Sequence, residues 1–353
     1  MKTIIVNLGE NTYPIYIESA LLESAGFLIR RHIPNAKKIF IVTDSNVIRH
    51  YAMSVKETIA KEGVEVTLKI IKAGEKSKNL NVLTSLYNDL VEAKITRSDA
   101  IVALGGGVVG DLAGFLASTY LRGVKFVQIP TSLLAQVDSS VGGKVAIDLP
   151  AGKNLVGSFY HPSLVIVDPT VLGTLDKRFL RDGLAEVIKY ALIKDEELFN
   201  ILNNVEDIEK LESSFAEIIY RCCNIKKEIV EMDERDTGER MILNFGHTIG
   251  HAIETVCGYE EYTHGEGVSI GMNAITGISE EMGLTVSGTH KKILQLLKKY
   301  ELPTEMPKIN KEKILSVMQL DKKNLDSNLN VVLLEKIGKA YIYKTDVTFF
   351  RGL

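Results

Sequence analysis

The chain has 353 residues, which is enough for two domains of ordinary size. Hydrophobic residues make up 45% of it and charged residues 25%, as in soluble globular proteins, and the net charge of -3 excludes a basic field for nucleic acid. No apolar run approaches the roughly 18 residues of a membrane span, and the first residues alternate like a strand rather than a signal peptide. Three cysteines make no disulfide framework, so we expect a cytoplasmic protein without nucleic-acid or membrane partners.

The N-terminal part of the chain alternates predicted strands with predicted helices. Buried-strand runs are expected at 38–43, 64–71, 100–104, 124–129 and 164–167, and apolar residues at 80–93 have helical spacing. The alternation predicts a Rossmann-like α/β domain, with a mostly parallel sheet and helices on both faces. Ligands of such sheets gather at the carboxyl ends of strands. Here those ends carry polar residues or glycines: Asp44, Gly74, Glu75, three consecutive glycines and Thr131.

After Pro169 the pattern changes and becomes helical over about 180–320. Its apolar stripes are typical of helices that face a core. The end of the chain returns to short strands at 331–334 and 340–344. We therefore expect an α/β domain over 1–169, a mainly α-helical domain over 170–353, and a cleft between them.

A glycine motif follows the predicted strand at 100–104. Gly105, Gly107 and Gly110 satisfy G-x-G-x-x-G before a predicted helix, a context in which backbone N–H groups hold a dinucleotide pyrophosphate. The same spacing also occurs as plain tight packing. No acid follows about 20 residues downstream to take the ribose hydroxyls. A dinucleotide would therefore need its ribose held elsewhere, by Asp44 or Glu75.

Three histidines form a second group of chemically active residues. His247 and His251 are four residues apart in a predicted helix, so their rings project from one face. This spacing suits a divalent metal, although a zincin would have Glu where this chain has Thr248. His264 follows closely, and Glu186 in an apolar helix would complete a Glu/His/His set with an open position for catalysis. The alternative is a pair of helix-surface histidines and an exposed acid.

Several cations stand beside glycine or amide residues. They are Lys144, Lys153, Arg240, Lys322 and Lys323. Each alone is typical of a solvated surface charge. Together they favour an anionic, phosphorylated small substrate.

Six motifs combine these features in one order along the chain. They are GGGVVGDLAGF at 105–115, QVDSSVGGK at 136–144, GKN at 152–154, GLAEVIK at 183–189, NFGHTIGHAIE at 244–254 and HGEGVSIGM at 264–272. Together they closely resemble the 3-dehydroquinate synthase family, and the resemblance runs over residues 44–323. Two departures are small: many members have Thr-Thr where this chain has Thr131-Ser132, and the proline often found before Gly74 is missing.

The resemblance implies a dehydroquinate synthase-like fold and a carbon–oxygen lyase that acts on phosphates in the shikimate pathway, which leads to chorismate and the aromatic amino acids. Such enzymes convert 3-deoxy-D-arabino-heptulosonate 7-phosphate to 3-dehydroquinate and phosphate. They use NAD and Zn2+ or Co2+. NAD takes a hydride from C5 of the substrate, phosphate is then eliminated, and the hydride is returned in the same turnover. An intramolecular aldol closure follows.

The resemblance also implies roles for individual residues. Glu186, His247 and His264 look like the metal ligands, which would leave His251 for the substrate phosphate or for proton transfer. The residues expected to hold NAD are Asp44, Asn46, Gly74, Glu75, Lys78, Gly107, Val108, Val109, Gly110, Asp111, Thr131, Ser132, Lys144, Lys153, Val171, Leu172, Gly173 and Thr174. Those expected to meet substrate are Arg122, Asp138, Lys144, Asn154, Lys189, Lys226, Arg240, Asn244, His251, Lys322 and Lys323. Lys144, Asn154, Lys189, Arg240 and His251 are the expected catalytic residues. Arg122 looks like an arginine that reaches the phosphate in a neighbouring subunit, which implies a homodimer.

Three other functions stay open on the sequence. A related sugar-phosphate cyclase would act on sedoheptulose 7-phosphate, or on glucose 6-phosphate as a 2-deoxy-scyllo-inosose type enzyme. An iron- or zinc-dependent glycerol-type dehydrogenase would show net reduction of NAD. A nucleotide-sensing regulator would bind NAD without depending on a metal.

Overall fold

A computed structural model describes residues 1–258, 261–308, 311–320 and 329–352. The chain divides into two compact units. Unit 1 consists of Met1–Asp176 and Lys226–Arg235, and unit 2 consists of Lys177–Ile225 and Asp236–Leu353. The boundary expected near residue 170 lies close to this division. The return of Lys226–Arg235 to unit 1 has no counterpart in that expectation.

Unit 1 is built on a seven-stranded sheet with the order β1-β2-β9-β6-β5-β3-β4. Only β1 and β2 pair antiparallel, and all other neighbours in this sheet are parallel. The strands are β1 (Lys2–Val6), β2 (Tyr13–Ile17), β3 (Lys38–Asp44), β4 (Glu65–Ile71), β5 (Ala100–Gly105), β6 (Lys125–Pro130) and β9 (Leu164–Val167). The expected strands and the mostly parallel sheet are confirmed.

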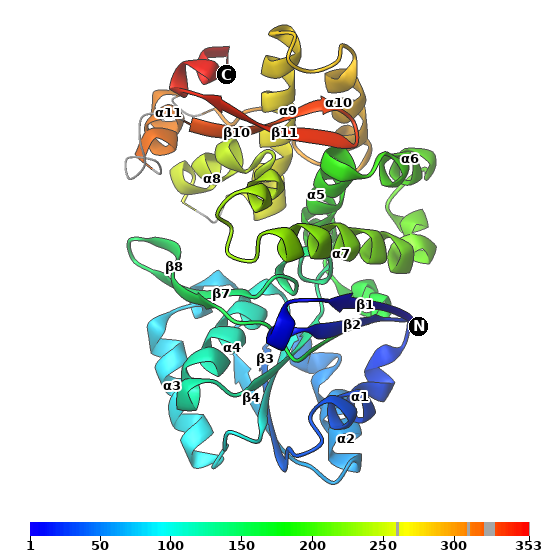
Figure 1. Ribbon diagram of the computed structural model, residues 1–353, viewed down its shortest axis with the longest axis vertical. Helices are drawn as coiled ribbons and strands as arrows, with labels where there is room; N and C mark the ends of the chain where they lie inside the picture. Colours follow the sequence, from blue (N-terminus) through cyan, green and yellow to red (C-terminus); the bar gives the residue numbers. More distant parts are fainter. Residues whose placement is uncertain (259–260, 309–310, 321–328, 353) are drawn as a thin grey trace. The chain divides into compact units, whose positions relative to one another are not determined.

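Helices cover both faces of this sheet (Figure 1). They are α1 (Ala25–His32), α2 (Ala52–Lys61), α3 (Leu80–Glu92) and α4 (Gly107–Thr119). Side chains alternate along β3, because Ile39 and Ile41 pack with α1 and α2 whereas Phe40 and Val42 pack with α3 and α4. A strand that is buried on both faces has a continuous run of apolar residues. For this reason the positions of these strands could be predicted from the sequence.

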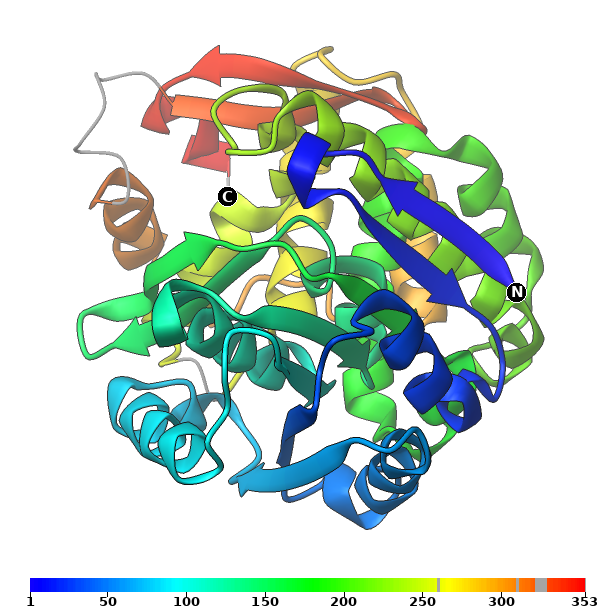
Figure 2. The same cartoon turned by 60° about the horizontal axis from the view of Figure 1, so that its bottom comes forward.

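A hairpin, β7 (Lys144–Leu149) and β8 (Gly152–Phe159), was not expected from the sequence. Most residues of β8 are exposed, so its sequence lacks the apolar alternation that marks a half-buried strand. The tip of this hairpin extends away from the central sheet (Figures 1 and 2). A π-helical turn (Ala135–Ser139) precedes the hairpin.

Unit 2 is mainly helical, as expected, and ends in a two-stranded hairpin. Its helices are α5 (Lys177–Lys194), α6 (Glu196–Asn204), α8 (His247–Val256), α9 (His264–Glu281), α10 (Thr289–Lys299) and α11 (Lys311–Leu320), and its strands are β10 (Leu329–Lys336) and β11 (Lys339–Thr345). Helix α7 (Phe215–Met232) begins in unit 2, and its residues from Lys226 onward belong to unit 1. Among the described residues, no helix combines the length and the apolar character needed to span a bilayer.

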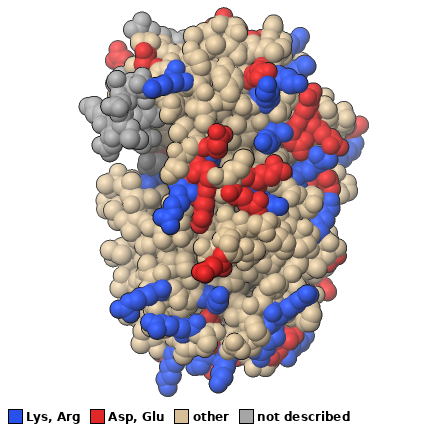
Figure 3. Space-filling view, viewed as in Figure 1, with Lys and Arg blue, Asp and Glu red and all other residues tan. Residues whose placement is uncertain are grey.

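Short 3-10 segments connect these elements. They are η1 (Gly9–Asn11), η2 (Leu21–Ser24), η3 (Val47–Arg49), η4 (Glu75–Ser77), η5 (Tyr120–Arg122), η7 (Pro169–Thr174), η8 (Glu209–Ser214), η9 (Glu239–Asn244) and η10 (Val347–Gly352). The surface of the molecule carries charges of both signs. Acidic and basic side chains both occur on the face seen in Figure 3. This mixture agrees with the small net charge of -3.

The packing of α4 against the sheet gives a test of the fold. A Cβ atom at Gly114 would lie 2.4 Å from Cγ1 of Val145 and 2.9 Å from Cε1 of Phe126, both of them buried. Gly to Ala inside a helix ordinarily stabilises by about 0.5–1 kcal/mol. We expect Gly114→Ala instead to lower the free energy of unfolding by roughly 1–3 kcal/mol, because the core must shift to admit the methyl group. Urea denaturation measures it. Gly173→Ala in η7 is the control, since no atom lies within 4 Å of its added Cβ. A raised midpoint for Gly114→Ala would contradict this packing.

Candidate active site

The glycine motif lies where β5 ends and α4 begins. Gly106 is the N-cap of α4 and supplies no side-chain acceptor, and the first α4 bond runs from Gly110 N to Gly106 O at 3.0 Å. The N–H groups of Gly107, Val108 and Val109 therefore have no partner within the helix, which is the arrangement that binds phosphate at helix N-termini.

Two members of the expected NAD set make packing contacts in this helix. A Cβ atom at Gly110 would lie 2.8 Å from Oε1 of Gln128 on β6. The Val109 side chain is buried in the core and touches the position of a Cβ at Gly105. These contacts hold α4 close to the sheet, the role expected of the third glycine of the motif.

The carboxyl ends of β3, β4, β5 and β6 meet at one edge of the sheet, as predicted. The register pairs Asp44 with Ile71 and Gly105 with Pro130, and Thr131 N donates to Gly105 O at 3.0 Å. At this edge Asp44 Oδ1 accepts from the backbone N–H groups of Asn46 at 2.8 Å and Val47 at 3.0 Å. One carboxylate oxygen of Asp44 thus shapes the turn that follows β3.

A buried lysine collects several other members of the expected NAD set. Lys78 Nζ lies 2.5 Å from Asp111 Oδ2, 2.5 Å from Asn154 Oδ1 and 3.8 Å from Glu75 Oε1. Burial acts to lower the pKa of Lys78, but Asp111 and Glu75 outweigh it and raise that pKa. Burial raises the pKa of both Glu75 and Asp111. This network links η4, α4 and the β7–β8 hairpin within unit 1.

The structure also joins two residues of the expected substrate set. Lys226 Nζ lies 2.9 Å from Asp138 Oδ1 and donates to Asp138 O at 2.6 Å. Lys226 belongs to the part of α7 that returns to unit 1. Lys144 is exposed at the start of β7, and Lys153 is half-buried in β8.

Five further expected residues of unit 1 lie in two short 3-10 segments. In η7, Val171 and Leu172 are buried, Gly173 follows, and Thr174 Oγ1 lies 2.7 Å from Tyr51 Oη. In η5, Arg122 is exposed and its backbone has a φ of 66°. Such a conformation is uncommon for a residue other than glycine.

Unit 2 contains the expected metal-binding group. Nε2 of His247 and Nε2 of His264 both lie 3.4 Å from Oε1 of Glu186, and the ligand atoms of the three residues lie within 4.8 Å of one another. Glu186 is 1% exposed and also forms an ion pair with Lys189, whose Nζ lies 4.6 Å from the centre of the Tyr190 ring. A buried carboxylate and two imidazole nitrogens suit Zn2+ or Co2+.

Glycines bring the two histidine-bearing helices together. A Cβ atom at Gly271 of α9 would lie 2.0 Å from Gly246 O, and one at Gly250 of α8 would lie 2.9 Å from Gly267 C. Gly246 itself has a φ of 80°, which favours glycine at the start of α8. This close approach leaves the ring centres of His247 and His264 5.1 Å apart.

The electrostatic environment separates the two histidines. Burial lowers the pKa of His247 to about 3, so this ring is neutral and has a lone pair for a metal. Burial also acts to lower the pKa of His264, but hydrogen bonds to Glu186 and Glu254 raise it well above the ordinary value.

His251 belongs to the same cluster. Its ring centre lies 5.4 Å from that of His247 and 5.9 Å from that of His264, and it is exposed. A second group with metal-ligand spacing, His251, Glu254 and His264, shares His264 with the first. Spacing along the chain singled out His247 and His251, whereas the three-dimensional structure pairs His247 with His264 at Glu186.

The other expected residues of unit 2 lie in or beyond η9. Arg240 is buried and Asn244 is exposed, and η9 directly precedes α8. Lys322 and Lys323 fall outside the described residues.

Two buried acids beside the metal-binding group were missed in the sequence. Glu254 Oε1 lies 3.0 Å from His264 Nδ1, and Asp182 Oδ1 accepts from Gly265 N at 2.5 Å. Glu254 stands three residues after His251 and seven after His247, on the same helical face. That spacing was the available signal. No comparable signal marks Asp182, because its partner is distant in sequence.

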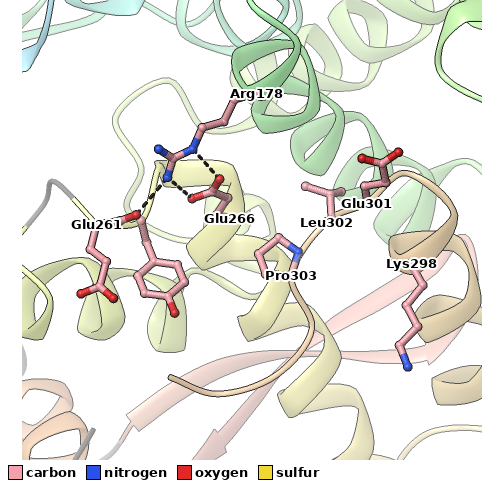
Figure 4. A pocket seen from close by; sticks show the side chains of 8 residues that line it. Arg178, Glu261, Glu266, Lys298, Glu301, Leu302 and Pro303 are labelled. Atoms are coloured by element: carbon pink, nitrogen blue, oxygen red, sulfur yellow. Dashed lines mark hydrogen bonds and ion pairs between the residues drawn. The ribbon is translucent and has the colours of Figure 1, made fainter. Parts of the chain in front are cut away.

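A shallow pocket of about 570 Å³ lies elsewhere in unit 2 (Figure 4). It is lined by Arg178, Glu261, Tyr262, Glu266, Lys298, Glu301, Leu302 and Pro303. The guanidinium of Arg178 donates to Glu266 Oε1 at 2.7 Å and Oε2 at 2.8 Å, and to Glu261 O at 2.9 Å. Arg178 therefore anchors the start of α9 rather than presenting a charge to a ligand.

The Lys78 network gives a test of the charge balance within unit 1. Lys78→Met removes the cation from between Asp111 and Glu75, so we expect the free energy of unfolding to fall by about 3 kcal/mol. Urea denaturation at neutral pH measures this, with Lys125→Met at an exposed position as the control. Equal midpoints for the two variants would show that Lys78 does not compensate the neighbouring carboxylates.

Comparisons with known proteins agree with this architecture. The family model "3-dehydroquinate synthase N-terminal" matches residues 68–182, and "3-dehydroquinate synthase C-terminal" matches residues 183–324. A 3-dehydroquinate synthase of Clostridium beijerinckii is 54% identical over 350 residues, 99% of this chain and 100% of that protein.

Two solved structures share the whole fold. A 2-deoxy-scyllo-inosose synthase complexed with carbaglucose-6-phosphate, NAD+ and Co2+ has a TM-score of 0.89 at 26% identity, covering 99% of this chain and 98% of that chain. A 2-epi-5-epi-valiolone synthase from Streptomyces hygroscopicus with NAD+ and Zn2+ bound has a TM-score of 0.87 at 26% identity, covering 98% and 96%. The identity to the dehydroquinate synthase is about twice as high. With both family models matched in order along one chain, this protein belongs to the 3-dehydroquinate synthase family.

Proposed function

We propose that this chain converts 3-deoxy-D-arabino-heptulosonate 7-phosphate to 3-dehydroquinate and phosphate, as the family to which it belongs does. The observation that carries the proposal is the buried group in unit 2, where two imidazole nitrogens lie 3.4 Å from one oxygen of Glu186. Whole-length identity of 54% to a 3-dehydroquinate synthase supports the choice of substrate over those of the two cyclases with 26% identity.

Glu186, His247 and His264 would hold Zn2+ or Co2+. All three ligand atoms are close together and Glu186 is almost fully buried, so the donor set fits a divalent ion that prefers nitrogen and oxygen ligands. When bound, such an ion supplies Lewis acidity, which lowers the pKa of substrate hydroxyls and polarises a carbonyl oxygen. Lys189 pairs with Glu186 and limits the negative charge of the group before an ion enters.

Unit 1 would hold NAD at the sheet edge. The uncapped first turn of α4 would donate N–H groups to the pyrophosphate, and Asp44 and Glu75 lie at neighbouring strand ends for the ribose hydroxyls. NAD supplies a hydride acceptor that is restored in the same turnover, so the overall reaction needs no external oxidant. The Lys78 network would fix η4 and the hairpin beside this edge.

The chain's own cations and amides would bind the sugar phosphate. We assign Lys144 and Asn154 on the hairpin, and Lys189 and Arg240 in unit 2, as donors to phosphate and hydroxyl oxygens. Lys226 contacts Asp138 at Oδ1 and at the backbone carbonyl oxygen, and we assign that carboxylate to a substrate hydroxyl. His251, exposed at the rim of the histidine cluster, is the residue we assign to the phosphate or to proton transfer.

The test is release of inorganic phosphate from the heptulosonate, with sedoheptulose 7-phosphate and glucose 6-phosphate in parallel. We expect release from the heptulosonate alone, dependent on added NAD and on Zn2+ or Co2+, without net formation of NADH. His247→Ala should lose bound metal and lower the rate by more than about 100-fold. Loss of a residue that only hydrogen-bonds to a metal ligand already costs about 10- to 100-fold, and this variant removes a ligand itself. His50→Ala, an exposed histidine in unit 1, should retain both.

Three results would contradict this function. Release from another sugar phosphate but not the heptulosonate would assign the chain to a different cyclase. Net NADH formation would indicate a dehydrogenase. Full activity after treatment with EDTA would remove the metal from the reaction.

We further propose a cytoplasmic homodimer in which Arg122 completes the phosphate site of the neighbouring subunit. If so, Arg122→Ala and His247→Ala should each be inactive alone. When the two variants are unfolded and refolded together in equal amounts, half of the dimers contain one chain of each. Each mixed dimer has one intact site out of two, so we expect roughly a quarter of wild-type activity per chain. Arg122→Ala mixed with wild-type chain in the same way is the control. No recovery in the mixed sample, with dimers present by sedimentation, would place Arg122 in its own subunit's site or outside both.

A further inference from the structure

Glu254 is a buried acid to which the proposed function assigns no role. It lies in the third turn of α8, its side chain is 4% exposed, and its Oε1 is 3.0 Å from Nδ1 of His264. Burying a carboxylate is costly unless it is paired or hydrogen-bonded. Its partner here is a residue of the metal-binding group, so the question is what the contact does for that group.

The two histidines of the group have matching surroundings. His264 has Nδ1 beside Glu254 and Nε2 beside Glu186 Oε1 at 3.4 Å. His247 has Nδ1 3.1 Å from Phe245 O and Nε2 3.4 Å from the same Glu186 oxygen. In both rings an oxygen that only accepts hydrogen bonds faces Nδ1. A cation beside Glu186 needs the lone pair of Nε2, and the acceptor at Nδ1 then holds the one proton of the neutral ring.

A different role for Glu254 would be that of a ligand. His251, Glu254 and His264 also have ligand atoms within 4.8 Å of one another. A cation bound there through Nδ1 of His264, together with one at Glu186 bound through Nε2, would need His264 to lose both ring protons. His251 is moreover exposed, whereas Glu186 is buried. The geometry therefore favours one ion, at Glu186, with Glu254 behind the His264 ring.

We propose that Glu254 is a positioning residue that accepts the Nδ1 proton of His264 and so presents Nε2 of that ring to a divalent cation. The proposal rests on the metal-binding group of the proposed function. It assigns to Glu254 the role of an outer carboxylate, which fixes ring orientation and makes the imidazole a better donor.

The backbone at His264 is held independently of Glu254. Asp182 Oδ1 accepts from Gly265 N, and a Cβ atom at Gly265 would lie 2.0 Å from Asp182 O. Thr263 and Glu266 form a reciprocal cap at the start of α9. Substitution of Glu254 should thus change the orientation and tautomer of the ring while α9 stays in place.

The test measures Co2+ binding to Glu254→Gln and Glu254→Ala by competition with a chromophoric chelator, and the visible spectrum of bound Co2+. Gln keeps an oxygen that can accept the Nδ1 proton, and Ala keeps none. We expect affinity to fall in the order wild type, Gln, Ala, with a loss of roughly 10- to 100-fold for Ala. One ion should bind per chain in each case. Glu281→Gln, an exposed acid on α9, is the control with wild-type affinity.

Nitrogen-15 spectra of the zinc-bound protein add a readout that does not depend on affinity. His264 should carry its proton on Nδ1 in the wild type and in Glu254→Gln. If Glu254→Ala does not fold, the Gln variant and the wild-type spectrum still decide the question.

Two results would overturn the proposal. One is wild-type Co2+ affinity in Glu254→Ala or, where that variant does not fold, a wild-type His264 ring that carries no proton on Nδ1. The other is two ions per wild-type chain and one in the variants, which would make Glu254 a ligand. Neither measurement requires turnover, so a wild-type chain that binds Co2+ but releases no phosphate would overturn the proposed function and leave this inference standing.

Discussion

The close approach of α8 and α9 is the constraint on which the metal-binding group depends. The two backbones meet where Gly246 faces Gly271 and Gly250 faces Gly267, at distances that leave no room for a Cβ atom. Packed helices ordinarily lie 8–10 Å apart, at a distance set by the side chains at the contact. A side chain at Gly250 or Gly271 would meet the backbone of the other helix and push the two histidine-bearing helices apart. The glycines of two sequence motifs thus have a common purpose: they set the distance between two ligands.

Helix α4 of unit 1 depends on glycine in the same way. Gly110 and Gly114 allow α4 to lie against β6 and β7, and this contact fixes where the uncapped first turn of α4 ends up relative to the sheet edge. A motif read as a phosphate cradle is therefore also a packing motif. The two readings do not compete, because a helix N-terminus binds an anion well only when its position is fixed.

Much of unit 1 could be predicted because its strands are buried on both faces. Runs such as 100–104 leave little choice of structure. The β7–β8 hairpin could not be predicted, since its exposed strand lacks an apolar pattern and bonds to Lys78 after η4 and to Ser118 of α4. In unit 2, spacing correctly predicted a histidine-bearing helix but indicated His251 as the partner of His247. The actual neighbour, His264, is brought in by helix packing, which no local pattern reports. The same holds for Asp182, whose partner Gly265 is 83 residues away.

The charges around the metal-binding group explain why a cation and an anionic substrate suit one place. Glu186 and Glu254 each contribute a negative charge, and Lys189 returns one positive charge. Without an ion, Glu186 and Glu254 also raise the pKa of His264, so that ring holds a proton and adds a second positive charge. A divalent ion takes the lone pair of the ring nitrogen and displaces this proton, so the group gains one net positive charge when the ion binds. In a site of low dielectric a single added charge acts strongly, which favours an anionic substrate beside the ion. Lys189 adds to this effect, because it offsets one of the carboxylates in both states.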